Sequence, residues 1–465
     1  MKERIYIKDL KNRVGDSVCV LGLVDIRRDH GKLIFLDLRD ETGKVQAVAL
    51  PNHTEAQEVA NKLRTEWVVE VTAQVNERPP KMVKQDEMNG SIELELLSIT
   101  ILNESETPAI DISTDGHEIG EESRLRYRYL DLRRARLQKN IRKRYEVTKF
   151  IRDFLDAKNF IEIETPLLTK STPEGARDYI VPSRLDNGQF YALPQSPQQF
   201  KQLLMASGFE KYFQIARCMR DEDTRGDRQP EFTQLDMEMA FPTREEILRL
   251  NEELLIDIVK VLFPEKVIQQ IPFPRLTYKE AMEKYGNDRP DLREDKKDPN
   301  LLAFCWVIDF PLFEKTDTGY TFSHNPFCSP KDEYVDDVMN EKNLESIISN
   351  QYDIALNGLE IGGGSIRIHN AKVQEKILAI LGHSPEAIQE NFGHMLEAFK
   401  TGTPPHGGIA WGFDRLLMIL LNEPNIREVI AFPKTGEGRD LMLEAPSKVS
   451  ATQLIELGIS IDKKA

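Results

Sequence analysis

The stretch FQIARCMRDEDTRGDRQPEFTQLDME, residues 213–238, decides the fold of the larger part of this chain. Its apolar-rich segments Phe213–Met219 and Phe232–Met239 flank a polar, highly charged loop. The flanks predict antiparallel strands, and the loop predicts a long hairpin connection. Arg220 and Glu222 stand two apart at the end of the first strand, so their side chains point the same way. Arginine there suits a phosphate, because its planar fork donates two parallel hydrogen bonds. The alternative is a solvated hairpin tip.

Length and composition bound the class of protein. The chain has 465 residues, enough for two or three domains, and 40% hydrophobic and 30% charged residues are typical of a globular protein. No apolar run approaches membrane-spanning length. The four cysteines are far apart and form no CxxC pair. This pattern predicts reduced thiols in a cytoplasmic protein, and not a zinc site or disulfide framework.

Charge is distributed unevenly along the chain. The formal net charge of −15 argues against non-specific binding along a nucleic-acid backbone. However, Arg124–Arg144 contains ten Lys or Arg residues and one acid, Asp131. This run indicates either a local nucleic-acid surface or a solvated helix face. Because a stretch of acids and turn formers precedes it, residues 104–137 are predicted to be a hinge or linker.

Residues 1–103 have the pattern of a small β-barrel. The predicted order is three strands, a helix and two strands, at Val18–Arg28, Leu33–Asp40, Val45–Leu50, Thr54–Leu63, Trp67–Asn76 and Ile92–Leu102. This is the order of the OB-fold, a barrel whose face binds single-stranded nucleic acid. Arg28, Phe35 and Gln46 would supply a charge, a stacking ring and an amide that reads a base edge. Each could equally be an ordinary surface or core residue.

Residues 138–446 mix hairpins and helices without regular strand–helix alternation, and residues 447–465 form a C-terminal tail. No G-x-G-x-x-G or P-loop string is present, so neither of those nucleotide sites is indicated. The triple glycine Gly362–Gly364 predicts close backbone packing. Further elements are expected as helices at Leu137–Ala157, Ser196–Met205, Thr243–Phe263 and Glu386–Lys400, strands at Phe160–Pro166, Trp306–Phe313 and Ile361–His369, and a strand–helix unit at Gly407–Leu421.

Three sequence motifs resemble those of a known protein family. Met219–Glu222 followed by Arg228–Gln234 resembles motif 2 of the class II aminoacyl-tRNA synthetases, in the form found in bacterial-type aspartyl-tRNA synthetases. Phe160–Pro166 resembles motif 1, which builds the family's dimer interface, and Gly407–Leu416 resembles motif 3. Arg126–Arg133 resembles the hinge of subclass IIb, whose members carry an anticodon-binding OB domain in front. The resemblance implies an α+β fold: an N-terminal OB-fold β-barrel, then a catalytic domain with a mainly antiparallel sheet flanked by helices, in a homodimer.

The resemblance also implies a reaction. L-aspartate and ATP, with Mg²⁺, would give aspartyl-adenylate and pyrophosphate, and the aspartyl group would then pass to tRNA(Asp). Asp353 and Glu360 are seven apart and resemble the family's Mg²⁺ ligands. Arg220 and Arg415 are the implied catalytic residues, which neutralise phosphate charge. The implied ATP-binding residues are Arg220, Asp221, Glu222, Gln229, Phe232, Glu360, Gly412, Phe413, Asp414 and Arg415.

A site for aspartate must distinguish a side-chain carboxylate from an amide. Two cations do this best, and Lys201 and Arg367 match the family's positions. The other implied amino-acid-binding residues are Glu174, Ser196, Gln198, Arg220, Asp236 and His324. This pair of cations argues against a paralogue that charges or synthesises asparagine, and the complete motif 3 argues against a catalytically silent RNA-binding protein. Asn325 stands where many relatives carry a second histidine.

The chain also departs from its relatives. Bacterial-type enzymes carry a domain-sized insertion between motifs 2 and 3, but here Pro290–Leu292 is followed only by a short charged link to Trp306. In the barrel, Val48 and Ile26 replace a common aromatic and a common arginine. His30 resembles relatives of relaxed specificity, which favours tRNA(Asn) as a second partner beside tRNA(Asp). The implied tRNA-binding residues are Arg28, His30, Phe35 and Gln46.

Overall fold

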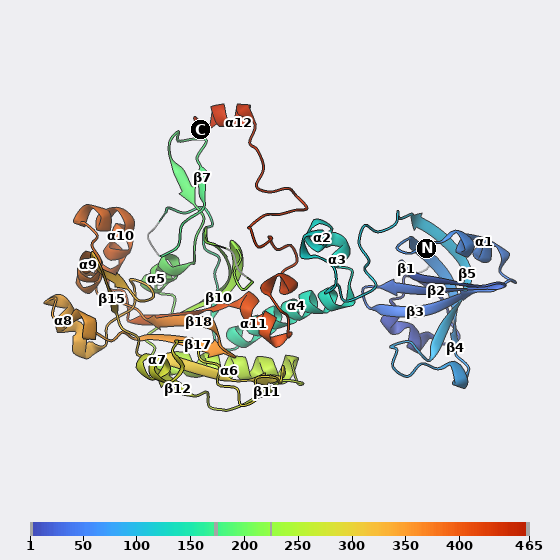
Figure 1. The fold of residues 1–465 in the computed structure, drawn as a ribbon, viewed down its shortest axis with the longest axis horizontal. Coiled ribbons are helices and arrows are strands. Elements are labelled where there is room, and N and C mark those ends of the chain that lie inside the picture. Colours follow the sequence, from blue (N-terminus) through green and yellow to red (C-terminus); the bar gives the residue numbers. More distant parts are fainter. Residues whose placement is uncertain (1–2, 172–174, 224–225, 462–465) are drawn as a thin grey trace. The chain divides into compact units, whose positions relative to one another are not determined.

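A computed structural model describes residues 3–171, 175–223 and 226–461 of the chain (Figure 1). The chain divides into two compact units, Met1–Thr114 and Asp115–Ala465, and each is described by itself. Among the described helices, none combines the length and the apolar character needed to cross a membrane.

The first unit is a closed five-stranded barrel with the strand order β1-β2-β3-β5-β4. Strands β3 and β5 pair in parallel, and the other neighbours pair antiparallel. Side chains alternate along each strand, so that Ile34, Leu36 and Leu38 are buried in the barrel. The barrel confirms the predicted OB-fold. Its elements are η1 (Ile7–Arg13), β1 (Ser17–His30), β2 (Leu33–Asp40), β3 (Gly43–Ala49), α1 (Thr54–Lys62), β4 (Val68–Glu77), η2 (Pro80–Met82) and β5 (Ile92–Asn103).

The second unit is built on an eight-stranded sheet with the order β12-β14-β17-β18-β19-β10-β9-β6. Only the edge pairs, β6 with β9 and β12 with β14, are parallel among the described strands of this sheet. The mainly antiparallel sheet predicted from the sequence is therefore confirmed. Its strands are β6 (Ile161–Glu162), β9 (Lys211–Met219), β10 (Glu231–Ala240), β12 (Arg275–Thr277), β14 (Phe304–Ile308), β17 (Gln351–Leu356), β18 (Leu359–Ile366) and β19 (His406–Gly412).

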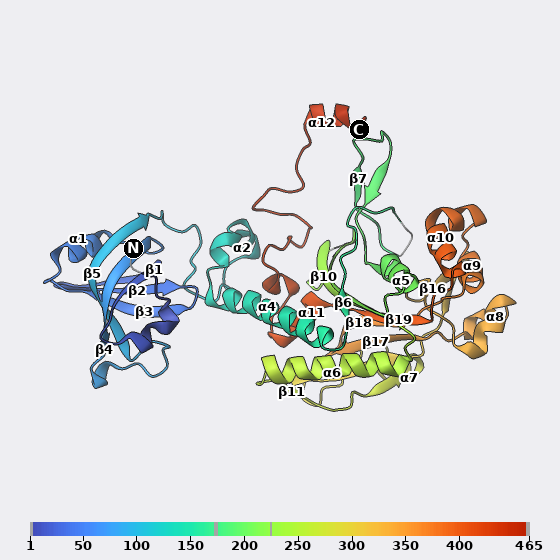
Figure 2. The same cartoon turned by 180° about the vertical axis from the view of Figure 1, so that it is seen from behind.

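Helices and small hairpins surround this sheet (Figure 2). The helices are α2 (Glu121–Arg126), α3 (Arg128–Asp131), α4 (Ala135–Asp156), α5 (Gln198–Ala206), α6 (Arg244–Leu262), α7 (Tyr278–Tyr285), η3 (Asp332–Tyr334), α8 (Val335–Met339), η4 (Leu344–Ser346), α9 (Ala371–Ile380), α10 (Pro385–Lys400), α11 (Phe413–Leu420), η5 (Ile426–Val429) and α12 (Ala451–Glu456). The short strand pairs are β7 (Ile180–Pro182) with β8 (Phe190–Ala192), β11 (Val267–Ile268) with β13 (Leu301–Leu302), and β15 (Phe313–Thr316) with β16 (Gly319–Phe322).

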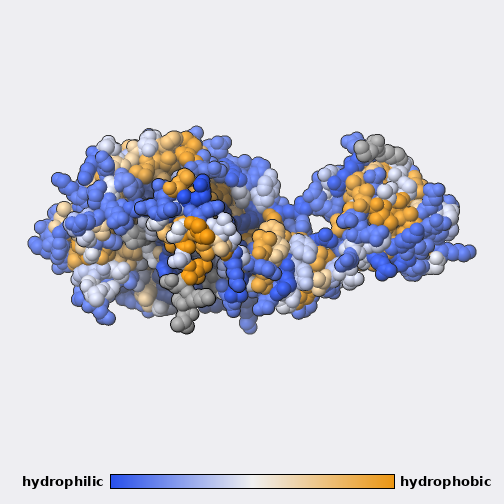
Figure 3. Space-filling view, turned by 90° about the horizontal axis from the view of Figure 1, so that it is seen from above, coloured by the Kyte–Doolittle hydropathy of each residue, from blue (hydrophilic) through white to orange (hydrophobic). Residues whose placement is uncertain are grey.

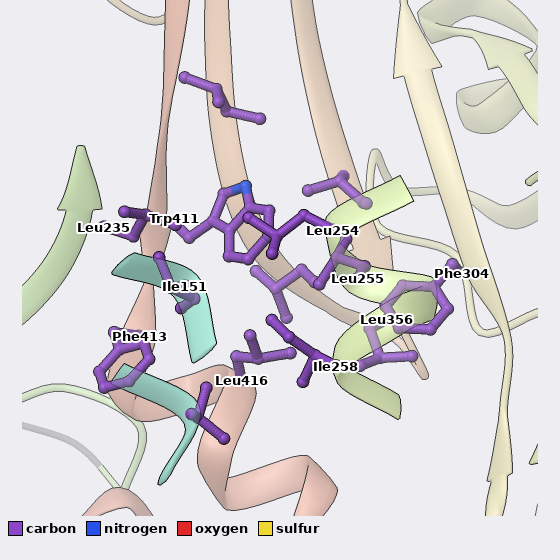
Figure 4. Packing of buried hydrophobic residues seen from close by; sticks show 14 of the residues in the cluster. Ile151, Leu235, Leu254, Leu255, Ile258, Phe304, Leu356, Trp411, Phe413 and Leu416 are labelled. Carbon is purple, nitrogen blue, oxygen red and sulfur yellow. The ribbon is translucent and has the colours of Figure 1, made fainter. Parts of the chain in front are cut away.

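One face of the large sheet packs on α4, α6 and α11 to form the core. Figure 4 shows Ile151 from α4 and Leu254 from α6 meeting Leu235 and Trp411 from the sheet. All four side chains are fully buried. Because successive strand residues point to opposite faces, filling one face with apolar side chains leaves the other face for polar ones. The functional side chains lie on that second face.

Three sequence-based expectations need correction or refinement. The strand expected over Phe160–Pro166 is reduced to the two residues of β6. The strand expected over Trp306–Phe313 ends at Ile308, because Asp309 adopts a left-handed conformation with φ of 62°. The triple glycine lies within β18, and a Cβ on Gly364 would stand 2.0 Å from the carbonyl oxygen of Gly408. That approach confirms the close backbone packing.

Part of the basic run is buried, which neither a nucleic-acid surface nor a solvated helix face predicted. Arg124, Arg128 and Arg134 are at most 6% exposed and surround the fully buried Asp131. We call these four residues the hinge cluster. Both carboxylate oxygens of Asp131 accept hydrogen bonds of 2.7–3.1 Å from the three guanidinium groups. Arg124 also donates to Glu428 (2.6 Å), so that this segment is fastened to η5.

Candidate active site

The polar face of β10 forms the floor of a cavity of about 410 Å³. Phe232, Gln234 and Asp236 line it at two-residue spacing, while Leu235 points into the core. Phe232 and Asp236 are four residues apart on an extended strand, a separation of about 13 Å. The floor therefore extends about that distance from the aromatic ring of Phe232 to the buried carboxylate of Asp236. The cavity is therefore long enough to hold two joined substrates end to end.

Most of the predicted site residues come together around this cavity. Among the described residues, the lining lacks Asp221, Lys201, Arg367 and Phe413, although all four were predicted. The ring of Phe413 is fully buried in the core, so its side chain is not a wall of the site. Glu174 lies outside the described residues. The predicted residues that do line the cavity are Ser196, Gln198, Arg220, Glu222, Gln229, Phe232, Asp236, His324, Asp353, Glu360, Gly412, Asp414 and Arg415.

Arg220 and Arg415 bring positive charge to the cavity from two different elements. Arg220 follows the last residue of β9, and its guanidinium carbon lies 5.1 Å from the centre of the Phe232 ring. Arg415 belongs to the first turn of α11 and donates to Asp227 (3.1 Å) and to the carbonyl of Glu360. The buried Nε of each arginine has no hydrogen-bond partner among the described residues. Both groups are therefore available to an anionic ligand.

Asp353 and Glu360 form an acidic wall with His324 beside it. Burial, together with the negative charge of Glu360, raises the pKa of Asp353 to about 7, although the nearby His324 opposes the shift. One Asp353 oxygen accepts from Gln351 Nε2 (2.6 Å), and the other lies 3.6 Å from His324 Nε2. A Cβ on Gly363 would stand 2.6 Å from the Asp353 carboxylate, so only glycine fits there. A cation at this wall would relieve the repulsion between the two acids.

Lys201, Asp236, Glu238 and Arg367 form a buried group at the Asp236 end of the floor, which we call the pocket cluster. Each is at most 2% exposed. Lys201 Nζ lies 2.6 Å from Asp236 Oδ1 and 3.3 Å from Glu238 Oε2, and Arg367 Nε donates to Glu238 (3.1 Å). The two cations predicted to read a substrate carboxylate are thus adjacent, but each already contacts an acid of the chain.

The two acids of the pocket cluster respond differently to burial. Burial raises the pKa of Asp236, although Lys201 opposes it. Burial also acts to raise the pKa of Glu238, but the charges of Arg367 and Lys201 overcome it and the pKa falls. Asp236 Oδ2 is buried and has no hydrogen-bond partner among the described residues. Tyr212 lies beside this carboxylate, and its hydroxyl donates to Gln214 Oε1 (3.0 Å). This carboxylate oxygen is ready for a cationic donor.

Several polar residues that line the cavity were not among the predicted site residues, including Gln234, Gln351 and Asp227. Gln234 lies between Phe232 and Asp236 on the same face of β10, and the strand alternation could have revealed it. Gln351 precedes Asp353 by two residues on β17 and could have been found in the same way. Asp227, which bonds Arg415, lies in an irregular loop where no sequence signal exists.

The four residues predicted to bind tRNA lie on the outside of the barrel. Arg28 forms a two-bond pair with Asp37 (2.8 Å each), and Gln46 Nε2 lies 3.4 Å from Glu93 Oε2. His30 meets the Phe35 ring edge-on, with the ring centres 5.5 Å apart. Residues 28 and 35 are register partners of β1 and β2. The outer face thus holds rings and hydrogen-bonding groups suited to unstacked bases.

Comparison with known proteins agrees with this architecture. The family described as tRNA synthetases class II (D, K and N) matches residues 120–436, and the OB-fold nucleic acid binding domain family matches residues 18–102. The solved asparaginyl-tRNA synthetase of Pyrococcus horikoshii, complexed with asparaginyl-adenylate, shares the fold with a TM-score of 0.74 and 21% identity, over 94% of this chain and 99% of that one.

Curated relatives resemble the chain more closely. The aspartate–tRNA(Asp/Asn) ligase of Natranaerobius thermophilus is 42% identical over 100% of both chains. The aspartate–tRNA ligase of Staphylococcus carnosus is 40% identical over 96% of this chain and 97% of its own length. The chain therefore belongs to the class II tRNA synthetases, in the branch of the aspartate–tRNA ligases, as the sequence motifs predicted.

The alignments also bear on the shortened connection. The alignment with the Natranaerobius protein runs over 590 positions, against the 465 residues of this chain. Where the sequence predicts that an insertion is missing, α7 is joined to β13 by residues 286–300 alone. Gln269 fastens this link through Leu292 and Glu294, with hydrogen bonds of 2.9 Å.

Proposed function

We propose that this chain is an ATP-dependent aspartate–tRNA ligase that joins L-aspartate to tRNA(Asp) through an aspartyl-adenylate. One observation carries the proposal. A single cavity presents donors from Arg220 and Arg415 and a buried carboxylate oxygen of Asp236, none of which has a hydrogen-bond partner among the residues that the structure describes. These are the partners required by a phosphate chain on one side and by an ammonium group on the other.

The pocket cluster explains the choice of amino acid through its charge. Its two cations and two acids cancel. L-aspartate brings an ammonium for Asp236 and a side-chain carboxylate for Lys201 and Arg367, and these two charges also cancel. Asparagine would bring the ammonium alone and leave one buried positive charge unbalanced, at a cost of about 3–5 kcal/mol. The α-carboxylate then remains free to face Arg220.

In the first step, an oxygen of the α-carboxylate attacks the α-phosphorus of ATP in line. The new O–P bond forms as the bond to the β-phosphate oxygen breaks, and pyrophosphate leaves. Arg220 neutralises charge on the α-phosphate and holds the attacking carboxylate, while Arg415 neutralises the outer phosphates. Phe232 supplies a stacking face for adenine. Gln229 offers to the same half of the site a buried Nε2 that has no hydrogen-bond partner in the described part of the chain.

Asp353 and Glu360 fit a Mg²⁺ ion. Two neighbouring carboxylates that repel each other suit a hard cation, and Mg²⁺ in nucleotide sites is held by one or two carboxylates plus substrate phosphates. When bound, the ion would neutralise phosphate charge during the displacement. Gln351 holds the Asp353 carboxylate in place through its 2.6 Å hydrogen bond.

In the second step, the terminal ribose hydroxyl of the tRNA attacks the aspartyl carbonyl. The ester bond forms, the bond to the adenylate phosphate breaks, and AMP leaves with the phosphate that accepts the hydroxyl proton. The barrel face of Arg28, His30, Phe35 and Gln46 would bind the anticodon. Because relatives named for both tRNAs are 41–42% identical, tRNA(Asn) is proposed as a second substrate.

The wider organisation is part of the proposal. We assign residues 1–103 to anticodon binding, 104–137 to the hinge, 138–446 to catalysis and 447–465 to a tail, and we place the enzyme in the cytoplasm. Exposed apolar side chains at Ile161, Leu167, Leu168 and the β7–β8 hairpin support a homodimer through motif 1. Figure 3 shows apolar side chains at the surface of this second unit.

The deciding experiment is aspartate-dependent exchange of labelled pyrophosphate into ATP, followed by charging of a purified tRNA(Asp) transcript. We expect exchange with aspartate and little with asparagine, and charging without any added protein, because the motifs on both sides of the short connection are complete. Absence of aspartate-dependent exchange would refute the proposed reaction. Exchange without charging of any tRNA would instead mean that a partner supplies the function of the missing insertion.

A further inference from the structure

The two long walls of the cavity are joined by a residue that does not line it. Arg144 lies in the middle of α4, on the core side of the sheet. Its NH1 donates to Asp414 Oδ1 (2.5 Å) and to the carbonyl of Val429 (3.2 Å), and its NH2 donates to Thr233 Oγ1 (2.8 Å). Its guanidinium carbon lies 5.0 Å from the centre of the Phe413 ring. One side chain therefore contacts β10, α11 and η5.

Asp414 completes the bridge from the other side. Its Oδ2 accepts the backbone N–H of Thr233 (2.8 Å), while its Oδ1 is held by Arg144. Strand β19 ends at Gly412, the register partner of Gln234 on β10. The Asp414 carboxylate thus accepts a hydrogen bond from the N–H of Thr233, the β10 residue just beyond this last pair. The bond ties the start of α11 to β10.

This carboxylate depends on Arg144 for its charge balance. Asp414 is 3% exposed, and a buried carboxylate without a cation is strongly disfavoured. Among the described residues, Asp414 forms an ion pair with Arg144 alone. Asp414 therefore directs both of its oxygens toward the protein, and we assign to it an orienting role instead of direct contact with ATP.

The bridge ends next to two residues that would bind ATP, Phe232 at the adenine and Arg415 at the outer phosphates. Thr233 follows Phe232, and Asp414 precedes Arg415; Phe232 and Arg415 both line the cavity. A shift of Asp414 or Thr233 would change the distance between these two walls. The opposite half of the cavity, where the amino acid would bind, is held in place by the contacts of the pocket cluster.

We propose that Arg144 is a positioning residue that sets the spacing of the nucleotide half of the site by bridging β10 to α11. The inference rests on the proposed function, because it concerns the binding of ATP for adenylate formation. Arg144 acts on the nucleotide half of the cavity through Asp414 and Thr233. It therefore controls the affinity for ATP and leaves the affinity for aspartate largely unchanged.

The test compares Arg144→Met, Arg144→Lys and a control, Arg142→Met, on the same helix. Arg142 is exposed, and it donates a hydrogen bond to Gln138 one turn away on the same helix (3.4 Å). In aspartate-dependent pyrophosphate exchange, Arg144→Met should raise the KM for ATP at least about tenfold and change the KM for aspartate less than about twofold. Arg144→Lys should show a smaller rise, because an ammonium keeps the charge but lacks the planar fork. The control should match the wild type.

A double variant separates positioning from general loosening. Asn at position 414 can still accept the Thr233 N–H but carries no charge, so Arg144→Met/Asp414→Asn should lie closer to wild type in its KM for ATP than Arg144→Met alone. An unchanged KM for ATP in folded Arg144→Met would overturn the inference. So would an equal rise of both KM values with a lowered Tm. If Arg144→Met does not fold, Arg144→Lys decides by the same criteria.

Failure of the proposed function would be recognised separately. Wild type without aspartate-dependent exchange would refute that function, and calorimetric titration with ATP would then decide about Arg144. Weaker ATP binding by Arg144→Met than by wild type and the Arg142→Met control would support the bridge. Equal binding, or no binding of ATP by wild type, would overturn it.

Discussion

The second unit contains two buried ionic groups of four side chains each, the hinge cluster and the pocket cluster, which differ in how completely their carboxylate oxygens are paired. In the hinge cluster, both oxygens of Asp131 accept hydrogen bonds from arginines. In the pocket cluster, Asp236 Oδ2 has no partner among the described residues. Three cations surround the first carboxylate, whereas two cations are shared between two acids in the second.

The pKa values follow the same division. Burial acts to raise the pKa of Asp131, but the bonds from Arg124 and Arg134 overcome it, and the pKa is lowered. Burial prevails at Asp236, whose pKa is raised although Lys201 opposes it. Ionised Asp131 thus contributes stability that is present above its unfolded pKa and is lost as the pH falls through the folded value. Asp236 contributes the opposite dependence, because burial disfavours its ionised form more than the ion pair with Lys201 stabilises it. A fully satisfied cluster holds the fold together, and an unsatisfied one leaves room for a ligand.

The largest effect is expected from breaking the complete cluster. Asp131→Asn should lower the free energy of unfolding by about 3–5 kcal/mol, because three buried guanidinium groups lose their shared charge partner. Denaturant unfolding measures this loss. The control is Glu162→Gln, which breaks the more exposed ion pair with Arg152 and should lower the free energy of unfolding by no more than about 1 kcal/mol. The KM for aspartate should not change. A stable Asp131→Asn variant with a raised KM for aspartate would reverse the assigned roles.

Removing charge from the cavity itself should reduce catalysis and leave stability nearly intact. Arg220→Ala should slow adenylate formation by at least ~10²-fold, equivalent to about 2.7 kcal/mol, because its guanidinium neutralises charge developing at phosphorus. The fold should survive, since the residue lies past the end of β9 on the cavity wall. Exchange kinetics measure the effect, with the melting temperature as the control. Near-normal exchange would remove Arg220 from the catalytic set.

Removing a cation from the pocket cluster should weaken the binding of only one substrate, aspartate. Lys201→Met should raise the KM for aspartate by about 10–100-fold, the equivalent of one charge-assisted hydrogen bond of about 1.5–3 kcal/mol. The KM for ATP should change little, and Arg367→Met should behave in the same way. Steady-state exchange with each substrate varied in turn measures the difference. Equal losses for both substrates would mean that these cations contact phosphate and that the amino-acid pocket lies elsewhere.

The sequence predicted individual helices and strands better than the contacts between them. Alternation and turn residues were enough for the barrel strands and for β9 and β10, because local periodicity decides which face of a strand is buried. The hinge cluster was not foreseen, since Arg124 reaches Glu428 across about three hundred residues. Nor could spacing reveal that Lys201 and Arg367 share Glu238 as an ion-pair partner. Local pattern carries no information about which buried charges pair across the fold.

The smallest expected effect lies on the barrel and concerns the choice of tRNA. His30 ends β1 and packs edge-on against Phe35, so the two rings form one surface beside the β1–β2 turn. The anticodons for aspartate and asparagine differ in their third letter. A ring with donor and acceptor nitrogens can stack on or bond either base, whereas an aliphatic chain cannot. His30→Leu should therefore shift preference toward tRNA(Asp) by about 0.5–1.5 kcal/mol, a factor of about 2–10.

The ratio of kcat/KM for the two transcripts, compared between wild type and variant, measures the shift. The exchange rate without tRNA should not change. Rejection of the tRNA(Asn) transcript by several hundredfold in the wild type would contradict relaxed specificity. An unchanged ratio in the variant would show instead that His30 faces solvent when tRNA is bound.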